Sequence, residues 1–155
     1  MSKTNLIFRK AQLADLPQII EMLVDDFLGK SREEFLNPLP DFYVKAFEEI
    51  NQSSENFLLV VDTKEKSVVA TMQMTFTPNL VRQGSKRLTI EAIRVHKDFR
   101  NQKIGEAMMN FAISEAKKRG CKIAQFTTDK ERSDAHRFYE KLGFQATHLG
   151  FKKII

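Results

Sequence analysis

A basic, amide-rich turn from Lys97 to Lys103 carries the clearest chemical signal in this sequence. A strand is expected immediately before the turn, and a helix is expected to begin after it, at Ile104 or Gly105. The first N–H groups of a helix have no acceptor within the helix, and the helix dipole adds positive potential at the same end. A strand, a basic turn and a helix N-terminus in this order therefore predict a site that holds phosphate groups.

Glu91 is the candidate for acid–base chemistry in the strand before this turn. A carboxylate on a central strand has to be solvated, ion-paired or functional, because burying it alone is costly. The structural alternative for Glu91 is an ion pair with Arg94, Arg87 or another cation. Simple alternation predicts one face with Thr89, Glu91, Ile93 and Val95, and the other with Leu88, Ile90, Ala92 and Arg94.

The elements that must position these residues follow from hydrophobic periodicity and turn signals. Apolar runs and alternation predict strands at 6–10, 57–62, 67–77, 88–95, 121–127, 144–148 and 151–155. Helical spacing and end signals predict helices at 16–29, 41–50 and 104–119, and a short one from a cap at Ser133 or Asp134 to Gly143. This order predicts one domain over residues 1–155 with an α/β fold: a mixed, mostly antiparallel sheet with helices on both faces.

Composition narrows the class of protein. The chain has 155 residues and is 42% hydrophobic, which suits one folded domain and argues against a disordered chain. Cys121 is the only cysteine, so no internal disulfide can form, and no signal peptide is visible at the start. A cytoplasmic location is therefore expected. The longest apolar run, 57–61, is far too short to span a bilayer, so no membrane association is expected.

The net charge of +5 has three readings: a nucleic-acid partner, an anionic cofactor, or a solvated surface with a mild basic excess. The sequence lacks a basic reading helix and an aromatic-studded basic strand, so no nucleic-acid partner is expected. The three His and one Cys do not have metal-ligand spacing, so no metal is expected.

Three segments together resemble the GNAT superfamily of N-acetyltransferases. VHKDFRNQKIGEAMM at 95–109 is similar to the family's strand-loop-helix pyrophosphate motif, and AHRFYEKLGF at 135–144 to its second signature. IFRKAQLADLPQIIEML at 7–23 is similar to the opening strand and helix, so the resemblance covers essentially the whole chain. The family usually has Gly where this chain has Asn101 and Lys103, and often Asn where it has Arg132. Asn tolerates unusual backbone angles, and Lys103 is tolerable if its backbone keeps ordinary helical angles.

The resemblance implies acetyl-CoA as co-substrate, lying against the strand that ends at Val95. The backbone of Ile93, Arg94 and Val95 would pair with the pantetheine arm like an extra strand, and Phe138 would pack in the core or beside that arm. The pyrophosphate would be held by the amides of seven residues: Arg100, Asn101, Gln102, Lys103, Ile104, Gly105 and Glu106.

The resemblance also implies a reaction. An amine must be neutral to attack the thioester, the carbonyl oxygen needs a hydrogen-bond donor, and the departing thiolate needs a proton. The backbone N–H of Ile93 is the expected donor. Tyr139 is the expected acid, or else a core aromatic; Glu91 is the expected base through water, or an anchor for the substrate ammonium.

The implied activity is N-acetylation of a primary amine by direct attack in a ternary complex, and the acceptor is left open between small molecules and proteins. The alternative is a catalytically inactive CoA-binding sensor or regulatory module. A homodimer is open, because family members often dimerise. The region that usually covers the acceptor contains Asp25, Asp26, Glu33 and Tyr43, which either select a cationic amine or are ordinary exposed residues.

Overall fold

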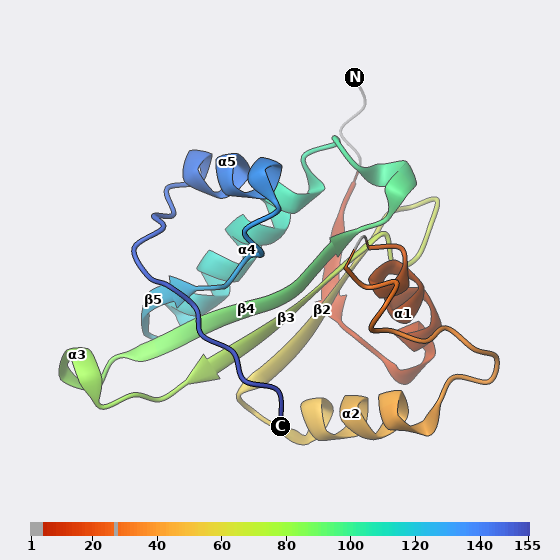
Figure 1. The fold of residues 1–155 in the computed structure, drawn as a ribbon, viewed down its shortest axis with the longest axis horizontal. Helices are drawn as coiled ribbons and strands as arrows, with labels where there is room; N and C mark the ends of the chain where they lie inside the picture. The colour runs from red at the N-terminus through yellow and green to blue at the C-terminus, as the bar shows by residue number, and fades with distance from the viewer. Residues whose placement is uncertain (1–4, 27) are drawn as a thin grey trace. The chain divides into compact units, whose positions relative to one another are not determined.

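The structure is a computed structural model that describes residues 5–26 and 28–155. The chain divides into two compact units, Met1–Gln125 and Phe126–Ile155. The larger unit is built on a five-stranded sheet in the order β1-β2-β3-β4-β5 (Figure 1). Its strands are β1 (Ile7–Lys10), β2 (Asn56–Asp62), β3 (Ala70–Thr77), β4 (Lys86–Val95) and β5 (Cys121–Gln125).

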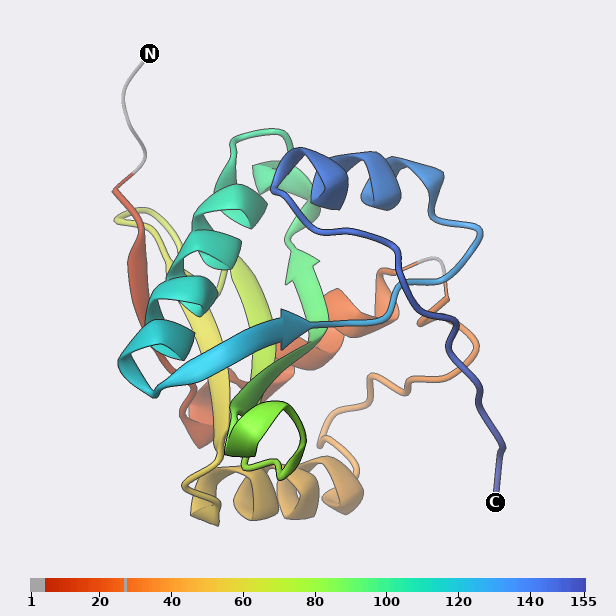
Figure 2. The ribbon, with the colours of Figure 1, turned by 90° about the vertical axis from the view of Figure 1, so that its left-hand side faces the viewer.

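The sheet is mixed, as the sequence predicts. Each strand from β1 to β4 pairs antiparallel with the next, and β5 pairs parallel with β4. A parallel pair needs a crossover connection, and the helix α4 (Ile104–Lys118) supplies it. In Figure 2, α4 crosses in front of the strands.

Helices cover both faces of this sheet. A short 3-10 turn, Leu13–Asp15, leads into α1 (Leu16–Val24), and α2 (Asp41–Gln52) follows. Apolar side chains of α1 and α2 form a core cluster with Leu58 and Val60 of β2. Phe57 and Leu59, which alternate with these two residues along β2, point to the opposite face. There the ring of Phe8 stacks on Phe111 of α4 at 5.1 Å, and the ring of Phe57 lies tilted at 6.3 Å from it, measured between ring centroids. One face therefore belongs to α1 and α2, and the other to α4.

Some predicted boundaries are wrong for local reasons. The strand predicted from Ser67 begins at Ala70, because Val68 has a left-handed φ of 51° and its N–H binds the Asp62 carboxylate at 2.8 Å. The helix predicted up to Gly29 ends at Val24; Phe27, which the prediction included, lies outside the described residues. The predicted loop at 78–86 contains one left-handed turn, α3 (Val81–Gly84), in which Arg82 and Gln83 have φ of 53° and 61°.

The smaller unit contains α5 (Ser133–Lys141), which confirms the short helix predicted there. The two strands predicted at 144–148 and 151–155 are wrong, because these residues have no strand assignment. A strand exists only through a ladder with a neighbour, and the N–H of Phe144 instead bonds to the carbonyl of Tyr139 at the end of α5. The apolar side chains of Leu149 and Phe151 are exposed.

Across residues 5–26 and 28–155, every helix falls short of the length and hydrophobicity needed to cross a bilayer.

Candidate functional site

β4 contains an irregularity at Ala92 that sets the geometry of the site. The register pairs Gln73 with Glu91 and Thr71 with Arg94, so three steps along β4 match two steps along β3. Ala92 has a left-handed φ of 51°. One extra residue in one strand of a pair, with a local departure from extended angles, is a β-bulge.

The bulge changes which residues share a face, and the predicted alternation is wrong beyond it. Directly opposed residues in an antiparallel pair project to the same face. Because Thr71 and Gln73 share a face of β3, their partners Arg94 and Glu91 share a face of β4. Val95, which pairs with Ala70, lies on the opposite face together with Ile90. Glu91 therefore does not share the face of Val95.

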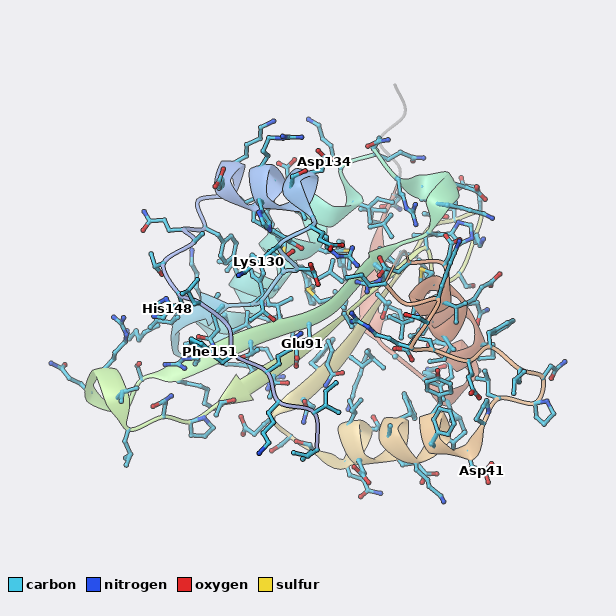
Figure 3. All side chains as sticks on the ribbon, in the orientation of Figure 1. Asp41, Glu91, Lys130, Asp134, His148 and Phe151 are labelled. Carbon is cyan, nitrogen blue, oxygen red and sulfur yellow. The ribbon has the colours of Figure 1, made fainter. Side chains whose placement is uncertain are left out.

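Glu91 lies on the face that α1 and α2 cover. Its partner Gln73 pairs with Leu58 of β2, a member of the core cluster under these helices. Glu91 and Ala92 are exposed, whereas Leu88 and Ile90 on the α4 face are buried. Figure 3 labels Glu91 midway along β4. The carboxylate is thus accessible on the sheet face opposite α4.

The second half of β4 has an open edge within the larger unit. β5 pairs with β4 only at Lys86–Thr89, so among the described residues of this unit no strand pairs with that edge beyond the bulge. The N–H of His96 bonds to the carbonyl of Val69 at 2.8 Å. By alternation, the backbone groups of Arg94 also face β3, and those of Ile93 and Val95 face the open edge. An extended ligand could pair there as an additional strand.

The basic turn follows directly from this edge. A 3-10 turn, Lys97–Phe99, leads to Arg100 and then to α4, which begins at Ile104. The N–H of Ala107 is the first in α4 to reach a backbone acceptor at the helix start, bonding to the carbonyl of Lys103 at 3.0 Å. The amides of Ile104, Gly105 and Glu106 precede it and have no acceptor within the helix. This end of α4 can therefore accept an anion.

The two positions where the family usually has Gly both adopt left-handed angles. Asn101 has a φ of 62° and Lys103 a φ of 61°. The condition that Lys103 keeps ordinary helical angles is therefore not met. Asn visits this region readily, but for Lys the conformation costs about 1 kcal/mol or more. The turn therefore has the left-handed backbone angles that glycine adopts without strain, and at Lys103 it also carries a positively charged ammonium group.

Two guanidinium groups hold the open-edge carbonyls of β4. Arg94 Nη1 donates to the carbonyl of Ile93 at 2.7 Å, and Arg100 Nε donates to the carbonyl of Val95 at 3.2 Å. Both arginines are also ion-paired with carboxylates just after α1: Arg94 with Asp26 at 3.2 Å and Arg100 with Asp25 at 3.3 Å. Asp25 and Asp26, which the resemblance places in the region that usually covers the acceptor, are thus engaged with β4 and the turn that follows it.

Asp25 and Arg100 border a cavity of about 220 Å³. It lies between the end of α1 and the end of β4, and its lining includes Glu21, Asp25, Phe35, Val95 and Arg100. The lining mixes carboxylates, cations and apolar side chains. Sequence reasoning missed this cavity, because only the ion pairs bring positions about 75 residues apart together.

Two other predicted acceptor residues bind each other. The hydroxyl of Tyr43 donates to Glu33 Oε2 at 2.9 Å and accepts from the N–H of Glu34 at 2.9 Å. Burial, together with the neighbouring carboxylates, raises the pKa of the Tyr43 phenol. Tyr43 is therefore a neutral hydrogen-bonding group at neutral pH that orders the segment before α2.

Cys121 does not offer an activated thiolate. Desolvation raises the pKa of its thiol, with Lys86 and Arg119 opposing the shift. A thiol that stays protonated at neutral pH is a poor nucleophile. Among the described residues, no three His, Cys, Asp or Glu side chains gather closely enough to hold a metal ion.

The smaller unit holds Tyr139 in an aromatic cluster. The ring of Tyr139 lies 4.2 Å from that of Phe126, 5.1 Å from that of Phe138 and 6.4 Å from that of Phe144, measured between ring centroids. Both Phe138 and Tyr139 are half-buried on α5. The ring of Tyr139 is thus fixed by packing, and this packing role coexists with any role of its hydroxyl.

Comparisons with known proteins identify a family and several relatives. The sequence model described as "Acetyltransferase (GNAT) family" matches residues 16–144. A 66-residue stretch is 35% identical to an aminoalkylphosphonate N-acetyltransferase of Salmonella typhimurium; it spans 43% of this chain and 43% of that enzyme, less than half of its length.

Solved structures resemble the whole chain. A crystal structure described as a transcriptional regulator from Bacillus halodurans is 48% identical, with a TM-score of 0.94, over 97% of this chain and 100% of that one. Glucosamine-6-phosphate N-acetyltransferase from Arabidopsis thaliana superimposes with a TM-score of 0.78 at 22% identity, over 97% of this chain and 98% of that one. The second likeness concerns the fold alone.

Proposed function

Because this chain belongs to the acetyltransferase (GNAT) family, we propose that it transfers the acetyl group of acetyl-CoA to a primary amine that attacks the thioester directly. The observation that supports this most is the open edge of β4 at Ile93 and Val95, which leads directly into the anion-accepting end of α4. Acetyl transfer in general follows from the family; the direct attack and the amine are the proposal.

The residues present fit the cofactor. The N–H groups of Ile93 and Val95 and the carbonyl of Val95 suit an extended amide-containing arm, and the amides of Ile104, Gly105 and Glu106 suit a pyrophosphate. The left-handed angles of Asn101 and Lys103 hold the turn in the path that presents these amides. When bound, acetyl-CoA supplies an acetyl thioester, and the N–H of Ile93 is the proposed donor to its carbonyl oxygen.

Glu91 is the proposed base or anchor on the acceptor side. Its exposed carboxylate lies on the face of β4 that α1 and α2 cover, one bulge away from Ile93. An alkylamine is mostly protonated at neutral pH, so a carboxylate there could remove its proton through water or hold the ammonium. Tyr139 is the proposed acid for the departing thiolate. The half-buried Phe138 of the same helix is proposed to pack beside the cofactor.

The test is release of CoA thiol with a panel of amines. The panel should contain an aminoalkylphosphonate, since a partial relative carries that name, together with a polyamine, an amino sugar, an amino acid and a peptide amine. An acetyl-CoA-only blank measures hydrolysis. Thiol release that depends on one amine, with a matching acetylated product by mass spectrometry, supports the proposal; CoA binding without release from any amine contradicts it.

A second candidate function is a CoA-binding regulatory module that performs no acetyl transfer. The observation in its favour is the description of the 48%-identical Bacillus halodurans protein as a transcriptional regulator. This candidate predicts that the protein binds CoA, that no amine accelerates thiol release, and that CoA changes binding to a partner. Binding to DNA with a steep dependence on salt would favour it over the enzyme, because phosphate contacts release counterions.

A further inference from the structure

We propose that Arg100 is a ligand-dependent switch: in the free protein it closes the open edge of β4 by holding Asp25 and the carbonyl of Val95, and an anionic ligand at α4 draws it away. We call these three groups the Arg100 switch. The inference rests on the proposed function, because it assumes that the anion is the pyrophosphate of CoA.

The first step is competition for one acceptor. The carbonyl of Val95 faces the open edge, where an extended ligand would pair, yet Arg100 Nε already donates to it at 3.2 Å. A ligand N–H cannot use this carbonyl well while the guanidinium occupies it. The ligand arm can therefore pair at Val95 only as Arg100 moves.

The second step is that the restraint on Arg100 is weak. Its ion pair with Asp25 is 3.3 Å long, and the two side chains are 52% and 43% exposed. Exposed ion pairs contribute little, because water screens them and the side chains lose freedom. By contrast, Arg94 and Asp26 are 24% and 10% exposed, and Asp26 also accepts the N–H of Leu28 at 3.2 Å. The guanidinium of Arg94 is therefore held more firmly than that of Arg100, which is free to change partners.

The third step is the attraction of the Arg100 guanidinium by an anion at the start of α4. Arg100 lies four residues before Ile104, so its guanidinium is within reach of an anion that binds the first amides of α4. A phosphate group offers a bidentate acceptor with more charge than one exposed carboxylate. Arrival of the anion therefore releases Asp25 and the Val95 carbonyl together, and Asp25 becomes a free carboxylate in the cavity that Glu21 also lines.

The closing experiment measures CoA affinity by titration calorimetry for wild type, Asp25→Asn, Glu21→Gln, Arg100→Ala and the double variant Asp25→Asn/Arg100→Ala. The switch predicts that Asp25→Asn binds CoA about two- to fivefold more tightly, since a competing exposed ion pair is removed. Glu21→Gln is the matched control, because it removes a carboxylate from the same cavity without touching Arg100 in the described contacts. It should leave the affinity near that of wild type.

The double variant makes the assignment specific. In the Arg100→Ala background, Asp25→Asn should change CoA affinity by less than a factor of about 1.5, because the ion pair that Asp25→Asn removes is already absent. Equal tightening by Glu21→Gln, no tightening by Asp25→Asn, or an unchanged Asp25→Asn effect without Arg100 would each overturn the switch. Failure of wild type to bind CoA at all would instead contradict the proposed function.

Discussion

Glu91 is the side chain whose placement the structure changes most. The sequence put it on the face of Val95, whereas the bulge at Ala92 puts it on the face of Arg94, under α1 and α2. Because that face lies opposite α4, we propose that the Glu91 carboxylate faces the amine acceptor. On this proposal Glu91 acts on the amine and makes no contact with the cofactor.

Replacing Glu91 by Gln tests this role. We expect kcat/KM for the amine to fall about 10- to 100-fold, because the variant keeps the shape but neither removes a proton nor pairs with an ammonium. The affinity for CoA should stay within about twofold of wild type. A lower kcat with a changed pH profile identifies a base, and a raised KM alone identifies an anchor. Wild-type kinetics in steady-state assays would remove Glu91 from the mechanism.

Tyr139 is tested by replacement with Phe. Its ring is packed against Phe126 and Phe138, and Phe preserves this packing while removing the hydroxyl. We expect kcat to fall about 100-fold or more, with little change in CoA affinity or thermal stability. Replacement of Phe138 by Leu is the matched control, since it disturbs the cluster without removing a proton donor. Unchanged turnover in Tyr139→Phe would assign this tyrosine to packing only.

At the scale of elements, the turn before α4 keeps its shape at a cost in stability. Lys103 is the N-cap of α4 and has φ of 61° and ψ of 14°. The preferred N-cap residues Ser, Thr, Asp and Asn accept a hydrogen bond from a first-turn N–H, and a lysine side chain cannot. Lys103 therefore contributes its positive charge and its left-handed backbone conformation. The start of α4 therefore carries a positively charged side chain on a residue with a strained backbone.

Replacing Lys103 by Gly should separate these two contributions. We expect the free energy of unfolding to rise by about 1 kcal/mol, which raises Tm by about 2–4 °C, because glycine relieves the left-handed strain. The affinity for CoA should fall about threefold through the lost charge. Lys103→Gln keeps the strain and loses the charge, so it should weaken CoA similarly without raising Tm. Calorimetric unfolding and CoA titration of both variants check this.

The start of the sheet is held by a second ionic cluster. Arg9 on β1 donates to Asp15 at 2.7 Å and to Asp62 at 2.6 Å, joining β1, the 3-10 turn and the end of β2. The hydrogen bonds from Arg9 hold the pKa of the Asp15 carboxyl below its usual range, against the opposing effect of burial. The N–H of Gln12 also donates to Asp15 at 2.7 Å.

Replacing Asp15 by Asn should cost about 2 kcal/mol of unfolding free energy at pH 7, since charged hydrogen bonds are lost. A depressed folded-state pKa stabilises the protein above the unfolded-state pKa, about 3.9, and this stabilisation is lost as pH falls through the folded value. The difference between wild type and Asp15→Asn should therefore shrink below about pH 4. Urea unfolding from pH 7 to pH 3 measures it.

Periodicity predicts most elements of the larger unit, because helices and strands there bury one continuous face. The helix at 104–119 ends within a residue of its predicted end, and β4 begins two residues before its predicted start. The features that periodicity does not predict depend on the backbone angles of single residues or on whether a strand finds a neighbour to pair with. The φ of Ala92 reverses the later faces of β4, and no periodicity encodes it. The strands predicted at 144–148 and 151–155 have suitable residues but no ladder.

The site could be predicted only in outline for the same reason. The sequence places the cradle at Arg100–Glu106 and the open edge at Ile93–Val95, since both follow from local order along the chain. It could not predict that Arg94 and Arg100 hold the edge carbonyls, because their partners Asp25 and Asp26 follow α1, about 70 residues earlier. Pairing over such a separation depends on how α1 packs on β4.

For the molecule as a whole, cofactor binding should appear as a gain in stability. At a CoA concentration of 100 times Kd, mass action adds about 2.7 kcal/mol, which corresponds to a Tm increase of about 5–10 °C. Differential scanning calorimetry with and without CoA measures this shift. Gly105→Leu, which places a bulky side chain at the proposed position of the pyrophosphate beside the first turn of α4, should lose most of the shift.

The Gly105→Leu result is interpretable only if its own Tm without CoA stays near that of wild type. A full CoA-induced shift in a folded Gly105→Leu protein would contradict the proposed position of the pyrophosphate. An absent shift in wild type would contradict CoA binding itself.

The bulge at Ala92 also makes β4 one residue longer than its pairing with β3 requires. Deletion of Ala92 would leave one residue between Glu91 and Arg94, just as one residue lies between their partners Gln73 and Thr71. Val95 would then stay on the α4 face and Arg94 on the opposite face, and only the bulge would be lost. Removal of one residue from the regular part of β3 or β4 would instead slip the pairing and move the side chains beyond it to the other face, so the two kinds of one-residue deletion should differ sharply in their effect on folding.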